Sequence, residues 1–578
     1  MRPVAAPRGD GDQPSESHRS SRTPVYTRGG VAPTGSEFSQ ARAILTDSRM
    51  LEPLQDRLDS PMGRPRSLSV EALLVAMLVN SLRRHHRATI VEITRLLNAF
   101  STGQLAAVGV KGWDPGEGYD RTDRLFNKLC SALEAGWEAS VDGVATRIDD
   151  TWFANRLAEA SLLGMPTSSK SLAVDGTAVE TWATMRGDLA DDDVDGVEAP
   201  PGQADTGPRV PRRRPKAQVL GIGSDGRKIY TADRDARAGH RSAVTSRGSG
   251  PYVGYELHLA VQTRDVRSSN GVDQVSLGDE VPAVITSLAL VAAGSHRGDA
   301  IVPHLLAWKA AGHELDEVVW DRGYSQLRPE TTSHLLHRAG VEQAFRPMET
   351  QRKTKPYSSD ALVVEGQLFS AHLPAHLRGP LAMPPMGAPV EQLLRYEQHF
   401  NQRAGYRYQR HAGPDADGVT RWRCPFCSGL LRARSLPKTM RRSRSTPLID
   451  LPEGEACCHG TVSISAADLP LWQRLPPGTT AWRISMGRRQ VVEGANAGLK
   501  GGYVNIERKF MRVLGRVKMT VMLACTVVGY NVDRIRAFVE RTTQAIRAPK
   551  RRAKRREGTW EDILGSTPPS PGPDPPPD

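Results

Sequence analysis

The sequence predicts a mixed α/β protein whose sheet follows a helical domain. Apolar residues recur at helical spacing between residues 68 and 97, whereas they alternate as in a strand along residues 252–262. Further on, a strand pattern at 281–291, a helix pattern near 299–311 and a second strand pattern at 315–320 follow one another. Strands interleaved with a helix in this way indicate a mixed α/β sheet.

Composition favours a multi-domain protein with a polyanionic partner. The chain has 578 residues, with 77 Lys+Arg against 64 Asp+Glu and a net charge of +13. At ~150 residues per domain this length allows roughly three or four domains, and the positive charge favours association with polyanions. No apolar run reaches the ~18 residues of a membrane-spanning helix, and the first residues lack the apolar core of a signal peptide. We therefore expect a cytoplasmic protein with no membrane partner.

Changes in composition divide the chain into six expected segments. Both ends are rich in proline and basic residues, which cannot build a core. The expected segments are a disordered basic arm (1–60), a helical DNA-binding domain (61–165), the first part of a core (166–345, with a polar insert at 187–215), an insertion domain (346–480), C-terminal helices of the core (481–545) and a disordered basic and proline-rich tail (546–578).

The helical domain contains a basic corner. Thr89-Ile-Val-Glu92 offers a capping box that would open a helix, and the sequence Arg83-Arg84-His85-His86-Arg87 lies just before it. One interpretation is a helix-turn-helix-like module that grips DNA phosphates. The other is a solvated turn in a helical bundle, and the residues do not decide between them.

Two aspartates follow apolar strand patterns. Asp175 comes after Leu172-Ala173-Val174, and Asp321 comes after the strand pattern at 315–320; a glycine follows each within two residues. Side chains at strand ends of an α/β sheet project into the crevice where ligands bind. Two such carboxylates could coordinate a hard cation such as Mg²⁺, although Asp-Gly is also a common turn dipeptide.

A third acidic residue lies in a helical pattern near the C-terminus. Met486, Arg489, Glu493 and Lys500 are 3, 4 and 7 residues apart, which would place all four on one stripe of a helix that stops at Gly501-Gly502. Such a stripe could hold a metal ligand between two phosphate-binding cations. The alternative is an exposed helix with an ordinary Arg–Glu ion pair.

Cysteine spacing indicates a second metal site. Cys424-Pro-Phe-Cys427 is a C-x-x-C knuckle, and 29 residues separate it from Cys457-Cys458-His459. Structural Zn²⁺ takes four Cys or His ligands in a tetrahedron. Cys424, Cys427 and Cys457 with either Cys458 or His459 would suffice, and the sequence does not choose the fourth ligand.

These motifs together resemble bacterial insertion-sequence DDE transposases. The segment Arg483–Lys500, RISMGRRQVVEGANAGLK, is similar to the family signature Tyr-x2-Arg-x3-Glu-x6-Lys, with Arg489, Glu493 and Lys500 in place and Met486 where the tyrosine is expected. Asp175-Gly-Thr resembles the first catalytic aspartate of the family, and Asp321-Arg-Gly-Tyr resembles the second. The motifs follow in order, with 145 residues between the aspartates and 171 between Asp321 and Glu493.

The resemblance implies a ribonuclease-H-like catalytic core. Asp175, Asp321 and Glu493 would bind two divalent ions, Mg²⁺ or Mn²⁺, for cleavage at the transposon ends and strand transfer into target DNA. Arg489 and Lys500 would hold phosphates at the transposon end, and Arg322 would contact DNA or pair beside the strand end. The expected partners are DNA and a second copy of the chain, as a homodimer that holds two ends together in the nucleoid.

The sequence therefore predicts a DNA transposase that binds terminal inverted repeats. Two other functions stay open: a domesticated DNA-binding regulatory protein without cleavage activity, and a metal-dependent nuclease that cuts without joining. Three like charges in a cleft favour the enzymes over the pure binding protein.

Overall fold

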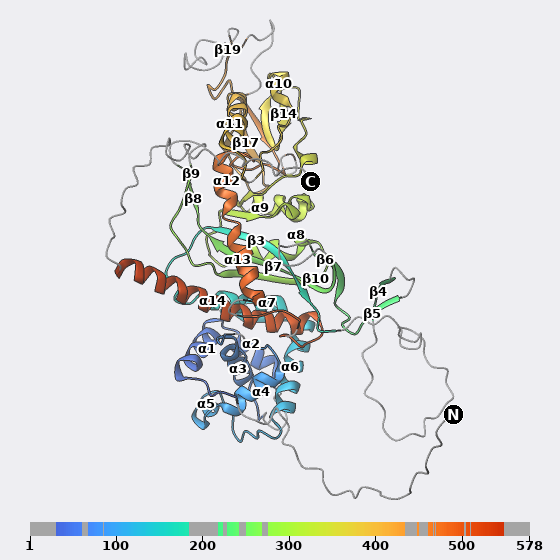
Figure 1. Cartoon of the computed structure of the whole chain (residues 1–578), viewed down its shortest axis with the longest axis vertical. Helices are drawn as coiled ribbons and strands as arrows, with labels where there is room; N and C mark the ends of the chain where they lie inside the picture. The colour runs from blue at the N-terminus through green and yellow to red at the C-terminus, as the bar shows by residue number, and fades with distance from the viewer. Residues whose placement is uncertain are drawn as a thin grey trace, which may run out of the picture. The chain divides into compact units, whose positions relative to one another are not determined.

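A computed structural model of the chain contains helices and strands arranged around one mixed sheet (Figure 1). It describes residues 30–59, 67–84, 86–183, 218–222, 228–241, 250–268, 275–385, 387–433, 448–449, 460–465, 468, 470–501, 504–508 and 510–547. The chain divides into two units, residues 1–535 and 536–578. The expected insert at 187–215 and most of the expected tail lie outside the described residues.

The described part of the chain contains helices of very different lengths. They are α1 (Gly35–Asp47), α2 (Leu51–Leu58), α3 (Val70–Ser81), α4 (Ile90–Ala99), α5 (Thr102–Ala107), α6 (Gly118–Ala135), α7 (Asp150–Ala160), α8 (Arg297–Ala310), α9 (Ser333–Arg338), α10 (Ala375–Arg378), α11 (Val390–Ala404), α12 (Thr480–Gly487), α13 (Gln490–Gly501) and α14 (Arg516–Arg547), with 3₁₀ turns η3 (Arg322–Gln326), η4 (Pro329–Thr331) and η5 (Glu349–Arg352). No described helix is both long and apolar enough to cross a membrane.

The described strands form one large sheet and several small ones. They are β1 (Trp137–Val141), β2 (Val144–Ile148), β3 (Ser171–Glu180), β4 (Gln218–Ile222), β5 (Lys228–Thr231), β6 (Arg237–Arg241), β7 (Gly250–Thr263), β8 (Val266–Ser268), β9 (Val275–Leu277), β10 (Ile285–Ala292), β11 (Glu317–Trp320), β12 (Glu342–Ala344), β13 (Lys355–Pro356), β14 (Ala361–Val364), β15 (Gln367–Ser370), β16 (Gln409–Ala412), β17 (Thr420–Arg423), β18 (Arg432–Ala433), β19 (Leu448–Ile449) and β20 (Thr461–Ile464).

The large sheet confirms the predicted mixed α/β fold. Its strand order is β10-β7-β3-β11-β12, and β6 adds to β7. The pairs β10–β7, β7–β3 and β6–β7 are antiparallel, whereas β3–β11 and β11–β12 are parallel. The predicted strands at 252–262, 281–291 and 315–320 correspond to β7, β10 and β11, and the predicted helix near 299–311 is α8.

Helices cover both faces of this sheet. On one face, α13 packs on β3 and β7 (Figure 1), and its Val492, Ala495 and Leu499 belong to the same apolar core as Leu257 and Leu259 of β7. On the other face, α8 packs on β10 and β7, in a second core. Since successive residues of a strand face opposite sides, β3 contributes to both cores.

The N-terminal helices correct one prediction and confirm another. Helices α1 and α2 lie inside the stretch expected to be a disordered arm, so that prediction is wrong for residues 30–59. Phe38, Ile44 and Leu54 are buried there, because α1 packs on α3 and α2 packs on α3 and α6, although the average composition of this stretch is polar. The predicted helix start at Thr89 is confirmed, since the Thr89 hydroxyl accepts a hydrogen bond from the Glu92 amide at 3.3 Å.

The expected insertion contains its own apolar core. Strands β14 and β15 and the pair β17–β20 contribute to this core, which includes Phe369, Trp422 and Phe426. A separate core is what an independently folded insertion needs, because each domain has to bury its own apolar surface.

Candidate active site

Two of the predicted acidic residues come from neighbouring parallel strands. Val174 of β3 pairs with Trp320 of β11, so Asp175 and Asp321 follow at the same level of the sheet. Asp321 ends β11 as predicted. The prediction that a strand ends at Asp175 is wrong, because β3 continues to Glu180 and pairs with β7 along its whole length.

Gly176 lies within β3, where the absence of a side chain allows residues of β7 to pack closely against it. It pairs with His258 of β7, and a Cβ placed on it would lie 2.8 Å from Oε1 of Glu256 and 3.0 Å from Nδ1 of His258. Both of these side chains are buried. The Asp-Gly dipeptide therefore reflects crowding on the face of the sheet opposite Asp175.

The turn after Asp321 is held against β7 from this same face. The Tyr324 hydroxyl and His258 Nδ1 are hydrogen-bonded at 2.7 Å, and the Tyr324 ring stacks on Trp320 with 5.3 Å between centroids. Burial lowers the pKa of His258 to about 3, so this imidazole is neutral at physiological pH. His258 is thus a structural histidine.

The helix carrying Glu493 begins later than the sequence pattern predicts. A single helical stripe from Met486 to Lys500 is wrong, because α12 ends at Gly487 and α13 begins at Gln490. Met486 therefore lies on a different helix from Glu493 and packs at the edge of a small apolar cluster with Trp482. Arg489 belongs to the junction between the two helices.

Arg488 anchors this junction to the sheet. Its buried guanidinium pairs with the Glu317 carboxylate at the start of β11 and donates to the Arg264 carbonyl just after β7 at 2.8 Å. It also donates to the Ser485 carbonyl at 3.0 Å, within α12. These contacts join α12, β7 and β11, so the next residue, Arg489, starts from a defined backbone position.

The three predicted acidic residues meet around the Arg489 guanidinium. Its Nη1 lies 3.9 Å from Asp175 Oδ2 and 3.9 Å from Asp321 Oδ1, and its Nη2 donates to Glu493 Oε1. The side chain of Asp175 is 19% exposed, against 44% for Asp321 and 49% for Glu493. Residues that are far apart in sequence thus share one partly buried cation.

Asn496 belongs to the same cluster and was not predicted. It lies one turn after Glu493 on α13, and its Nδ2 donates to Asp175 Oδ2 at 3.3 Å. Its Oδ1 is buried and has no hydrogen-bond partner among the described residues. The three-residue step from Glu493 would have placed Asn496 on the same helix face, but an asparagine carries no charge signal.

Burial disfavours the ionised form of Asp175. Removal from water raises its pKa to about 6, while the Gly176 amide, which donates to Oδ1 at 2.9 Å, and Arg489 oppose this change. The negative charges of Asp321 and Glu493 raise this pKa further. Three carboxylates face one guanidinium, so the site has an excess of negative charge.

The donor set of this cluster suits a hard divalent cation. Three carboxylates and an amide oxygen without a partner are oxygen ligands, which Mg²⁺ and Mn²⁺ prefer. As the side chains stand, no three His, Cys, Asp or Glu residues within the described ranges are grouped closely enough to hold a metal ion. The carboxylates surround Arg489 instead of converging on one point, so a metal would need this guanidinium to move.

The other predicted DNA contacts lie around this cluster. Arg322 follows Asp321 in η3 and its side chain is exposed. Lys500 is in the last turn of α13, about 10 Å along the helix axis from Glu493.

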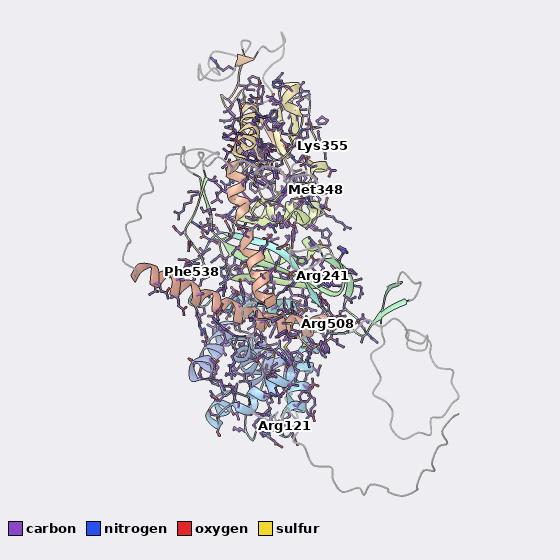
Figure 2. All side chains as sticks on the ribbon, in the orientation of Figure 1. Arg121, Arg241, Met348, Lys355, Arg508 and Phe538 are labelled. Carbon is purple, nitrogen blue, oxygen red and sulfur yellow. The ribbon has the colours of Figure 1, made fainter. Side chains whose placement is uncertain are left out.

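Basic and aromatic side chains also gather where β3 ends. Arg508 donates to the Ala183 carbonyl at 2.9 Å, and the Arg512 guanidinium lies 4.9 Å from the centre of the Trp182 ring. Arg241, labelled with Arg508 in Figure 2, pairs with Glu180 at 2.5 Å. Sequence reasoning missed this group because its members are scattered over 330 residues.

Half of the predicted zinc site can be located. Cys424 is buried and Cys427 is partly buried, directly after β17. The Cys424 amide donates to the Gly460 carbonyl at 3.1 Å, and the Ser428 amide donates to the Cys424 carbonyl at 2.8 Å. Cys457, Cys458 and His459 lie outside the described residues.

Comparison with known proteins adds no relative: no protein-family model, curated protein or solved structure matches the chain. The site is therefore defined by its own geometry, as a carboxylate cluster around an arginine, between α13 and the inner strands β3 and β11 of a mixed α/β sheet.

Proposed function

We propose that this protein is a DNA transposase with a ribonuclease-H-like core and an acidic active site formed by Asp175, Asp321 and Glu493. The observation that supports this most is their meeting around Arg489, since 145 and 171 residues separate them in the chain. Chance would rarely bring together the three acidic residues that the resemblance selects. Their neighbouring parallel strands and the helix α13 are the elements that such a core requires.

The reaction would be an in-line transfer of a phosphoryl group between DNA oxygens. The bound divalent ions would activate the attacking hydroxyl or water and neutralise charge on the leaving oxygen. The protein residues would position the reactants. Asp175, Asp321 and Glu493 would hold the ions, Asn496 orients Asp175, and Arg488 keeps the start of α13 against the sheet. Electrostatic positioning of this kind carries most of the rate in phosphoryl transfer.

Cations around the site would bind the DNA backbone. Arg322 is adjacent to Asp321, and Arg508, Arg512 and Trp182 gather beyond the end of β3. Guanidinium groups bind phosphates, and an exposed aromatic ring can stack on a base. In the helical domain, a cavity of about 360 Å³ is lined by Arg83, Arg84, Arg87 and Arg95.

Only some residues of the basic corner between α3 and α4 are placed as the predicted contact with DNA phosphates requires. Arg83 pairs with Glu37 at 3.2 Å, and Arg84 lies 3.7 Å from Asp533. His86 is buried, which lowers its pKa to about 4, whereas the Arg87 side chain is exposed. We therefore assign the terminal-repeat contact in this domain chiefly to Arg87, and His85 lies outside the described residues.

The test combines one substitution with a joining assay. Purified protein is mixed with Mg²⁺ or Mn²⁺ and a linear DNA that contains its gene with both flanking sequences, together with a supercoiled target plasmid. We expect cleavage at the gene flanks and joining to the plasmid, both abolished by Glu493→Gln without loss of DNA binding. Glu391→Gln, which removes an exposed carboxylate on α11, is the matched control and should keep both activities.

The same assay separates the alternative functions. Cleavage without joined products would indicate a metal-dependent nuclease. DNA binding without any cleavage in either metal would indicate a regulatory DNA-binding protein. Full cleavage by the Glu493→Gln variant would remove this residue from the mechanism and overturn the proposed site.

We also propose that the insertion domain binds structural Zn²⁺ through Cys424, Cys427 and two ligands from Cys457, Cys458 and His459. Its support is the hydrogen bond from Cys424 to Gly460, the residue that follows His459 in the chain. Metal analysis should find one zinc per chain in the wild type and none in Cys424→Ser. Equal zinc content in both would exclude this site.

We expect the active form to be a homodimer, because two transposon ends have to be held together for joining. Mass measurement of the complex with end DNA tests this expectation.

A further inference from the structure

Arg489 occupies the place where the three carboxylates could share a cation. Its two terminal nitrogens face all three side chains, with Asp175 and Asp321 on Nη1 and Glu493 on Nη2. The guanidinium is thus the positive charge that keeps three carboxylates together in the protein without metal. Without it, mutual repulsion in a partly buried site would separate them.

A guanidinium and a divalent ion cannot use these oxygens in the same way. Mg²⁺ requires oxygens at about 2.0–2.1 Å in an octahedron, and carboxylates that contract around an ion leave no room for an arginine between them. Arginine also has no lone pair to offer a metal. Binding of the ions and pairing with Arg489 therefore exclude each other.

We infer that Arg489 is an exchangeable counter-cation, which divalent metal displaces from the carboxylates and thereby frees to bind a DNA phosphate. This inference rests on the proposed function, because it takes Asp175, Asp321 and Glu493 as the metal ligands. It adds a role for Arg489 in the protein without DNA, and it links the metal site to the DNA site through one side chain.

We expect this exchange to move the Arg489 side chain and not the backbone. Arg489 lies between α12 and α13, where the neighbouring Arg488 is fixed by Glu317 and the Arg264 carbonyl. The Arg489 side chain is 25% exposed and is long enough to turn outward from this fixed point. Arg488 therefore fixes the junction between α12 and α13, and the Arg489 side chain moves.

The exchange couples the two ligands in both directions. Metal binding releases the guanidinium for phosphate, so metal should strengthen DNA binding. A phosphate that engages Arg489 removes the competitor from the carboxylates, so DNA should strengthen metal binding by the same factor. An unloaded protein would be a weak DNA binder at this site.

The first experiment measures binding of Mn²⁺ to the full-length protein without DNA, by electron paramagnetic resonance of the free ion. Arg489→Gln should bind Mn²⁺ about ten-fold more tightly than the wild type, within the 5–150-fold range usual for coupled sites. Arg489→Lys keeps a cation and should stay closer to the wild type. Asp321→Asn lacks one of the proposed ligands, so the Mn²⁺ that this variant still binds is bound elsewhere. This amount is subtracted from the binding of the other variants.

The matched control is Arg322→Gln. It removes one positive charge from the residue next to Asp321 but leaves the guanidinium among the carboxylates, so the affinity for Mn²⁺ should hardly change. If Arg322→Gln and Arg489→Gln gained the same affinity for Mn²⁺, the change in net charge would explain the gain, and the exchange would be overturned. Weaker Mn²⁺ binding in Arg489→Gln would also overturn it, since Arg489 would then support the ligands.

A second measurement tests the coupling with a short DNA duplex that lacks the gene flanks, at constant ionic strength. Mn²⁺ should raise duplex affinity about five-fold or more in the wild type and leave it unchanged in Arg489→Gln. Equal Mn²⁺ affinity in wild type and Arg489→Gln would refute the exchange but not the proposed metal site. Absence of carboxylate-dependent Mn²⁺ binding in every variant, with or without duplex, would overturn the proposed metal site as well.

Discussion

Replacing Asp175 by asparagine should stabilise the protein when no metal is present. Burial raises the pKa of Asp175 from 3.8 to about 6, so the folded protein binds this proton more tightly than the unfolded chain does. A raised carboxyl pKa means that the ionised form is unfavourable in the fold, and this cost is complete above pH ~6 and absent below pH ~3.8. The difference of about 2.2 pH units corresponds to about 3 kcal/mol at most.

Thermal unfolding in EDTA at pH 8 and pH 4 measures this effect. A domain of 150–250 residues shifts by about 2–4 °C per kcal/mol, so Asp175→Asn should melt up to about 6–12 °C above the wild type at pH 8. The gap should close at pH 4, where Asp175 is protonated in the folded wild type. Asp321→Asn, with a side chain 44% exposed, should change the melting temperature less.

Divalent metal should make the wild type more stable than Asp175→Asn, which reverses the order expected in EDTA. Mn²⁺ binds the folded wild type and stabilises it by mass action, whereas Asp175→Asn lacks one ligand and should gain less. A variant that melts below the wild type at pH 8 in EDTA would refute this reasoning, because the carboxylate would then support the fold. A gap of equal size at both pH values would refute the assignment to ionisation.

Four further substitutions test the packing around the site and the helices, each by thermal unfolding. Gly176→Ala should cost about 1–3 kcal/mol, because its Cβ would meet buried side chains on β7, whereas Gly494→Ala on an open face of α13 should gain up to about 1 kcal/mol. Gly529→Ala should reach or exceed the upper end of about 1–3 kcal/mol, since its Cβ would lie 2.0 Å from a backbone carbonyl of α3. Arg488→Met should cost about 3–5 kcal/mol by leaving the Glu317 carboxylate buried without its partner; a loss below 1 kcal/mol would show that it does not anchor the helix junction.

The fold was predictable where the spacing of apolar residues matches the period of a strand or a helix. Strands β7, β10 and β11 and helix α8 follow directly from apolar spacing, because each buries a face of the same sheet. Helices α1 and α2 were missed because the stretch around them is rich in polar residues and their apolar residues are few. Their stability comes from packing on α3 and α6, which local composition does not show.

The site was predictable in its charged residues and not in their geometry. Spacing and the family signature selected the three acids and Arg489, and the structure brings these four together. The break between α12 and α13 was missed, because the 3.6-residue pattern continues through it while Arg488 turns inward to Glu317. Asn496 was missed because its role comes from a neighbour 321 residues away.

The order of the site residues along the chain has a consequence during synthesis. Asp175 and Asp321 belong to strands that precede the insertion, while Arg489 and Glu493 follow it. At ~5–20 residues per second, a ribosome needs roughly 9–34 s to pass from Asp321 to Glu493. Throughout this interval the nascent chain carries its N-terminal helices and two adjacent carboxylates, yet has neither the third acid nor its arginine. A chain that stops within the insertion would therefore contain the N-terminal helices and both aspartates but have no complete acidic site.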